Sequence, residues 1–111
     1  MPGKFKLVEE KSFLSVYSNG KVEVRLRRIQ GDQGFVDIDV FTLKFGEPTY
    51  DVALTSDGYS VTTDIRFPMR SLRPKRIDKA IGLLQDAKAG IQDIEDLLRM
   101  LFPDTPIADR P

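Results

Sequence analysis

The 111-residue chain carries 17 basic and 17 acidic side chains, and it contains neither cysteine nor histidine. Its length suits one domain with one hydrophobic core. The two missing residue types exclude disulfides, thiolate or imidazole metal sites and Ser-His-Asp catalysis from this sequence, and the zero net charge argues against binding by bulk positive charge alone.

Long apolar segments are missing from the sequence. No run of about 18 apolar residues occurs, and the first ten residues lack the apolar centre of a secretory signal. We therefore expect a cytoplasmic protein that does not cross a membrane. We also expect one domain over residues 1–103 and a short flexible tail over residues 104–111.

The N-terminal part of the chain is predicted to form short β-strands. Strand-like segments occur at 4–8 and 12–17, and Asn19-Gly20 follows the second. This pair is typical of a type I′ hairpin turn, because both positions tolerate a positive φ. The next strand, predicted at 21–29, should therefore pair antiparallel with the strand at 12–17.

The strand predicted at 21–29 has two chemically different faces. Its period of two places Val22, Val24 and Leu26 on one face, and Arg25 and Arg27 on the other. Across the turn, the residues expected beside the two arginines are Phe13, Ser15 and Tyr17.

Further strands are predicted at 35–45, 50–54 and 60–67. "GDQG" at 31–34 and Asp57-Gly58 supply turns between them. Because all connections have hairpin length, we expect an antiparallel meander of five or six strands.

One long helix is predicted from Pro74 to Phe102. Apolar residues recur there at alternating steps of three and four. The fold class is therefore α+β, a curved antiparallel sheet followed by one long C-terminal helix. We expect the helix to cover the sheet and also to form the seam of a homodimer, with these seam residues: Ile77, Leu84, Ile91, Ile94 and Leu98.

Basic and aromatic residues suggest binding of single-stranded nucleic acid. Aromatic rings can stack on unpaired bases while cations contact phosphates. The predicted phosphate contacts are Lys21, Arg25, Arg27 and Arg28. Phe13 and Tyr17 are predicted to stack on bases or to wall the groove. A second basic group is predicted to extend the track: Arg66, Arg70, Arg73, Lys75 and Arg76.

Each of these groups has an alternative interpretation. Arginines on the wet face of a strand are ordinary, and Phe13 and Tyr17 could belong to the core. The second basic group could pair with Asp64, Asp78 or the acids of a partner helix.

A metal-dependent nuclease is a further alternative. Asp37 and Asp39 share one face of a strand, where two carboxylates can hold a divalent cation. Such a pair more often forms a solvated surface or pairs with neighbouring arginines. We therefore expect no catalytic residue, no metal and no cofactor.

Two segments resemble a known family. Residues 13–29, "FLSVYSNGKVEVRLRRI", are similar to the strand-turn-strand of the positive cofactor four family of transcriptional coactivators. Residues 64–87 are similar to the last strand of that family and the start of its long helix. The matching positions in the first segment are Ser15, Val16, Gly20, Lys21, Val22, Val24 and Arg27.

The resemblance implies a curved antiparallel sheet backed by a helix, dimerisation through the helices and binding of single-stranded DNA on the strand face. Whirly and Pur-alpha proteins share this arrangement. We therefore expect a non-catalytic protein that binds single-stranded DNA or RNA in transcription, replication or repair. The alternative is a protein-protein assembly module that uses the long helix and a sheet edge.

Overall fold

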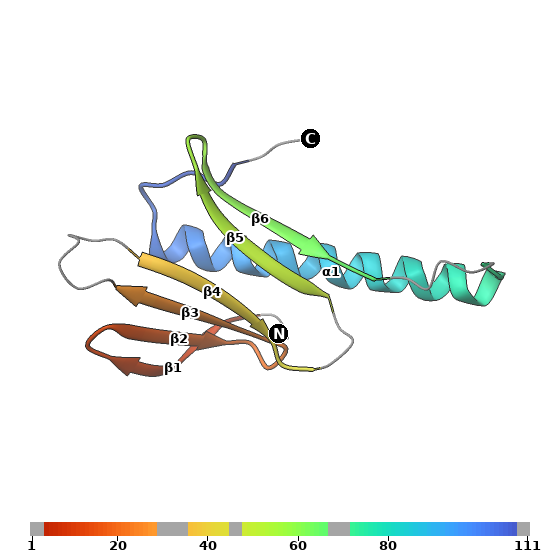
Figure 1. The fold of residues 1–111 in the computed structure, drawn as a ribbon, viewed down its shortest axis with the longest axis horizontal. Coiled ribbons are helices and arrows are strands. Elements are labelled where there is room, and N and C mark those ends of the chain that lie inside the picture. Colours follow the sequence, from red (N-terminus) through yellow and green to blue (C-terminus); the bar gives the residue numbers. More distant parts are fainter. Residues whose placement is uncertain (1–3, 29–35, 45–47, 67–71, 109–111) are drawn as a thin grey trace.

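The protein is described by a computed structural model that covers residues 4–28, 36–44, 48–66 and 72–108. Six strands precede one helix in this part of the chain, as the sequence predicts (Figure 1). The elements are β1 (Lys6–Lys11), β2 (Leu14–Ser18), β3 (Val22–Arg28), β4 (Val36–Thr42), β5 (Thr49–Thr55), β6 (Gly58–Asp64) and α1 (Pro74–Leu101).

All strand pairs are antiparallel, but they form two sheets. The larger sheet has the order β1-β2-β3-β4, and β5 pairs with β6 in a separate two-stranded sheet. β5 lies beside β4 in Figure 1 without forming a ladder with it. The predicted single meander is therefore divided between β4 and β5.

The turn between β2 and β3 is built around the side chain of Asn19. The backbone N–H groups of Lys21 and Val22 donate to Asn19 Oδ1 at 2.9 and 2.8 Å. Gly20 has a φ of 87°, whereas no described residue other than glycine has a positive φ. A type I′ turn needs a positive φ at both central positions, so the predicted turn type is wrong, although the turn occurs where it was predicted.

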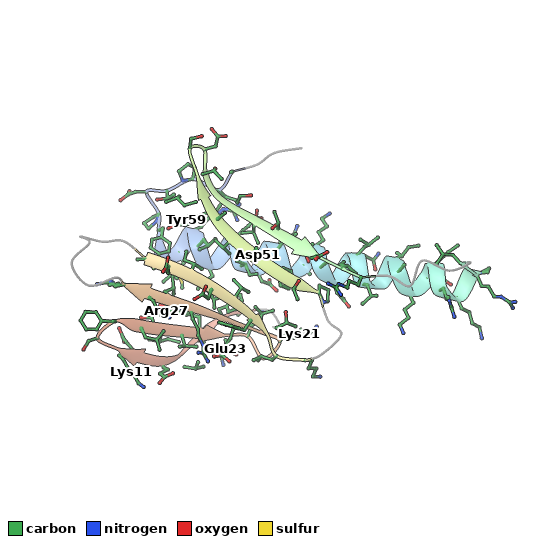
Figure 2. The ribbon with its side chains drawn as sticks, viewed as in Figure 1. Lys11, Lys21, Glu23, Arg27, Asp51 and Tyr59 are labelled. Atoms are coloured by element: carbon green, nitrogen blue, oxygen red, sulfur yellow. The ribbon has the colours of Figure 1, made fainter. Side chains whose placement is uncertain are left out.

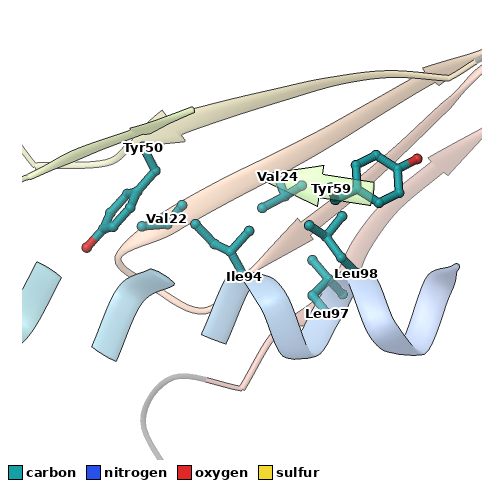
Figure 3. Packing of buried hydrophobic residues seen from close by; sticks show 7 residues of the cluster. All are labelled: Val22, Val24, Tyr50, Tyr59, Ile94, Leu97 and Leu98. Atoms are coloured by element: carbon teal, nitrogen blue, oxygen red, sulfur yellow. The ribbon is translucent and has the colours of Figure 1, made fainter. Parts of the chain in front are cut away.

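The core lies between α1 and the facing sides of the two sheets. The predicted apolar face of β3 is buried there, at Val22, Val24 and Leu26. The side chains of Ile94 and Leu98 come from α1 and are 0% exposed (Figure 3). The alternation of β3 and the helical period of α1 thus meet in one cluster.

The two halves of α1 differ in what covers them. Every fully buried residue of the helix lies in Ala87–Leu101, which we call the covered half. The remainder, Pro74–Asp86, extends past the ends of the strands in Figure 1, and we call it the projecting half. The protein is consequently elongated, with extents of 53 × 29 × 25 Å.

The segment after α1 folds back onto β6. Phe102 caps the helix by donating its N–H to Leu98 O at 2.8 Å. Further on, Tyr59 N–H donates to Pro106 O at 2.9 Å, and Ala108 N–H donates to Tyr59 O at 2.8 Å. The described part of the predicted flexible tail, residues 104–108, is therefore tied to the edge of the smaller sheet.

Among the described residues, no helix combines the length and the apolar character that crossing a lipid bilayer requires.

Candidate functional surfaces

The face of the four-stranded sheet that points away from α1, called the outer face below, contains Arg25 and Arg27. Both side chains are exposed there, as the alternation of β3 predicts. In the register with β4, Arg25 lies opposite Asp39, and Arg27 lies opposite Asp37. Because directly opposed residues share a face, both carboxylates stand among the arginines.

Both arginines already have partners. Arg27 Nη2 donates to Asp39 Oδ2 at 2.7 Å, and this bond raises the pKa of Arg27 above its ordinary value. Arg25 Nη2 lies 3.4 Å from Glu23 Oε1, and its guanidinium carbon lies 5.2 Å from the centre of the Phe41 ring. Phosphate binding here would compete with these contacts.

Acidic and basic groups are mixed over the whole outer face. Lys11 and Glu9 of β1 also lie on it, and they form an ion pair at 3.2 Å. The strand pairings therefore place four acids and four bases on this face: Glu9, Glu23, Asp37 and Asp39 against Lys6, Lys11, Arg25 and Arg27. This mixture does not form the positive surface that a nucleic-acid strand needs.

The expected position of the aromatic rings beside the arginines is wrong. Tyr17 lies opposite Val24 and packs against the core, whereas Leu14 and Val16 lie opposite Arg27 and Arg25. When a connection of two or four residues joins two antiparallel strands, even-numbered residues of one strand pair with odd-numbered residues of the other. The odd-numbered arginines of β3 must therefore pair with even-numbered residues of β2, and this parity could have been read from the sequence.

Phe13 and Arg28 meet at one end of the sheet instead. Phe13 is 52% exposed in the turn between β1 and β2, and its carbonyl accepts the N–H of Arg28 at 3.1 Å. Arg28 is the last residue of β3 and lies opposite Val36, on the side of the sheet that faces α1. The ring that does lie under Arg25 is Phe41 of β4, which pairs with Glu23 and was not predicted as part of the site.

The second basic group lies far from the first. Arg73 occupies the N-cap position at the free end of α1 without a side-chain capping bond, and Lys75 and Arg76 follow it there, all exposed. In Figure 2 that end of α1 is remote from Lys21 and Arg27. Arg66 is exposed after β6, and Arg70 lies outside the described residues. The two groups therefore do not form one continuous basic track.

The two aspartates considered for a metal site lie together, since Asp37 and Asp39 share the outer face. Asp39 is bonded to Arg27. Within the described ranges, no three His, Cys, Asp or Glu side chains are arranged to hold a metal ion.

The projecting half of α1 exposes a row of large apolar side chains. Ile77, Ile81 and Leu84 are 43%, 48% and 54% exposed, and we call these three residues the apolar stripe. At 3.6 residues per turn they lie within about 60° of one another around the helix. They therefore form one continuous surface.

The predicted dimer seam is divided between the core and this stripe. Ile94 and Leu98 are 0% exposed within one chain, so they pack in its own core. Ile91 is half-buried at the margin, while Ile77 and Leu84 remain exposed.

A contact between α1 and β5 was not foreseen. Tyr50 is buried, and its ring packs so closely on Gly90 that a Cβ at that glycine would overlap the ring. Beside this contact a cavity of ≈ 260 Å³ is lined by residues that include Lys21 and Asp93. Burial of the Asp93 carboxyl raises its pKa, repulsion from Asp96 raises it further, and attraction to Lys21 opposes both.

Comparison with known proteins gave no match: no family model, no curated protein and no solved structure matches this chain. The resemblance to the positive cofactor four family therefore stays a prediction.

Proposed function

We propose that this protein is a non-catalytic protein-interaction module whose contact surface is the apolar stripe on the projecting half of α1. The observation that carries the proposal is the exposure of Ile77, Ile81 and Leu84 on a helix segment that lies past the described strands. Contiguous exposed apolar surface rimmed by charged residues is a common mark of a protein-protein contact.

The projecting half also has weak support of its own. Isolated helices shorter than about 12–15 residues are marginal in water, and most helices in proteins are stabilised by packing of an apolar face. The first turn has no acidic residue, and cations near a helix N-terminus are unfavourable. A partner on the stripe would supply the packing that the described strands do not.

Binding of single-stranded nucleic acid, the first expectation from the sequence, has less support. Its two central arginines are engaged by Glu23 and Asp39, and the outer face has mixed charge. Titration of a labelled oligonucleotide at several salt concentrations separates the two functions. Tight binding that weakens steeply with salt, and that Arg25→Glu with Arg27→Glu abolishes, would favour the nucleic-acid function.

Photo-cross-linking in the cells that make the protein tests the interaction function. Leu84 is replaced by the photo-reactive residue p-benzoylphenylalanine, and a matched control carries it at Lys79. Lys79 is also exposed, and it lies about 140° from Leu84 around the same helix. We expect a discrete protein adduct from position 84 and little from position 79. Equal yields, or no adduct at either position, would contradict the proposal.

A further inference from the structure

We infer that the partner of the apolar stripe is a second copy of this chain, with the two α1 helices packed antiparallel about a two-fold axis at Leu84. This inference rests on the proposed function, because it names the occupant of the same surface.

The residues around Leu84 are arranged symmetrically along the helix. Ile77 lies seven residues before Leu84 and Ile91 seven residues after it, while Arg73 and Glu95 lie eleven before and eleven after. At 100° per residue, Ile77, Ile91 and Glu95 fall within about 20° of a line drawn through Leu84 along the helix axis, and Arg73 occupies the N-cap position at the end of the helix where this line begins. In chain order, these five residues are a cation, three apolar residues and an anion.

An antiparallel pair brings the matching parts of this line together. Leu84 meets Leu84 of the other copy, and Ile77 meets the other copy's half-buried Ile91. These contacts cover two of the three exposed residues of the apolar stripe, Ile77 and Leu84. Because a two-fold axis repeats every contact, Ile77 and Ile91 meet twice in the pair.

The charges at the two ends of the line favour the same arrangement. Arg73 of each copy lies opposite Glu95 of the other, and neither residue has an ion pair with another described residue. Glu95 then also stands beside the positive N-terminus of the neighbouring helix. In a parallel pair, each charged residue would face the same residue of the other chain. Arg73 would then meet Arg73, and Lys88 would meet Lys88.

The flank of the covered half is open for this contact. Lys88, Gln92 and Arg99 are exposed there and lie on the same side of the helix as Leu84. Each projecting half can therefore lie along the covered half of the other copy, and the core between α1 and the sheets stays unchanged.

Single cysteines test the inference, since the chain has none of its own. A disulfide forms when two Cα atoms approach within about 7 Å. Under mild oxidation we expect Leu84→Cys to form a disulfide-linked dimer. We expect Ile77→Cys alone to form no disulfide-linked dimer. A mixture of Ile77→Cys with Ile91→Cys should give the mixed dimer, and the exposed control Lys79→Cys should not cross-link. Circular dichroism shows whether each variant keeps its fold.

A charge exchange tests the predicted register. Arg73→Glu alone or Glu95→Arg alone places like charges together twice in each dimer. We expect each single variant to dimerise more weakly, on the order of tenfold, in sedimentation equilibrium at low salt. The double variant Arg73→Glu with Glu95→Arg should recover the wild-type dissociation constant. Failure of that recovery would overturn the register.

The outcomes separate this inference from the proposed function. Efficient cross-linking of Ile77→Cys alone would mean a parallel pair and would overturn the inference. A monomeric wild type whose photo-adduct at position 84 contains a different protein would also overturn it, but the interaction function would stand. A wild-type protein that is monomeric and yields no photo-adduct in cells would contradict both the inference and the proposed function.

Discussion

The covered and projecting halves of α1 carry the same apolar period but have different surroundings. Leu98 is 0% exposed, whereas Leu84, fourteen residues earlier at the same position of the repeat, is 54% exposed. The difference follows from length. A 28-residue helix extends about 42 Å, while a seven-residue strand spans about 23 Å. The apolar period therefore identifies the face of the helix that is suited to packing. The length of the sheet decides how much of that face is covered within one chain.

Replacing one leucine in each half by alanine should show most clearly that the two halves of α1 have different surroundings. Leu98→Ala leaves a cavity in the core and should lower the free energy of unfolding by about 2–5 kcal/mol. Leu84→Ala should change it by about 0.5 kcal/mol or less when the protein is dilute and unassociated. Urea unfolding followed by circular dichroism measures both variants. Similar losses would show that Leu84 also belongs to a core.

The two glycines of α1 provide a second matched pair. Gly90→Ala drives a methyl group into the ring of Tyr50 and should cost about 1–3 kcal/mol of unfolding free energy. Gly82→Ala places its methyl group in open space and should gain about 0.5–1 kcal/mol through better helix propensity. Opposite signs in thermal unfolding support the division of the helix, and a loss at both positions argues against it.

Replacing Asp93, in the covered half, should have the smallest effect on the free energy of unfolding, and this effect should depend on pH. Burial raises the pKa of its carboxyl in the folded state, so the folded protein binds more protons than the unfolded chain between the ordinary and the raised pKa. Stability contributed by this group therefore falls as the pH rises through that window. Asp93→Asn should be more stable than wild type at neutral pH, and the gain should vanish once the pH is below the ordinary aspartate pKa. A gain independent of pH would assign the effect to something other than this carboxyl.

Local patterns in the sequence predicted the elements well. The two faces of β3 follow from the alternation of Val22, Val24 and Leu26 with charged residues, and that alternation is confirmed. The start of α1 at Pro74 and its end beside Phe102 follow from the helical period. These features depend on interactions between residues close together in the chain, which a sequence displays directly.

Contacts between distant segments were predicted less well. Whether Arg25 and Arg27 are free depends on the acids that β4 brings beside them, and this follows from the register of two strands joined by a segment outside the described residues. The face of Tyr17 depends on the parity of one turn. The buried and exposed parts of the helix repeat depend on the relative lengths of the strands and α1. The parity of the turn could have been read from the sequence, but the register of β4 and the covered length of α1 are not set by a single local pattern.

Hydrogen exchange of the backbone amides of α1, measured by NMR at two protein concentrations, shows whether the projecting half lacks cover in one chain and gains it from a second copy. In dilute protein, we predict slow exchange in Ala87–Leu101 and fast exchange in Pro74–Asp86. At high concentration, protection should appear in Pro74–Asp86 because a second copy then covers it. Equal protection of both halves in dilute protein would contradict the division of α1, and a projecting half whose exchange does not change with concentration would contradict its contact with a second copy.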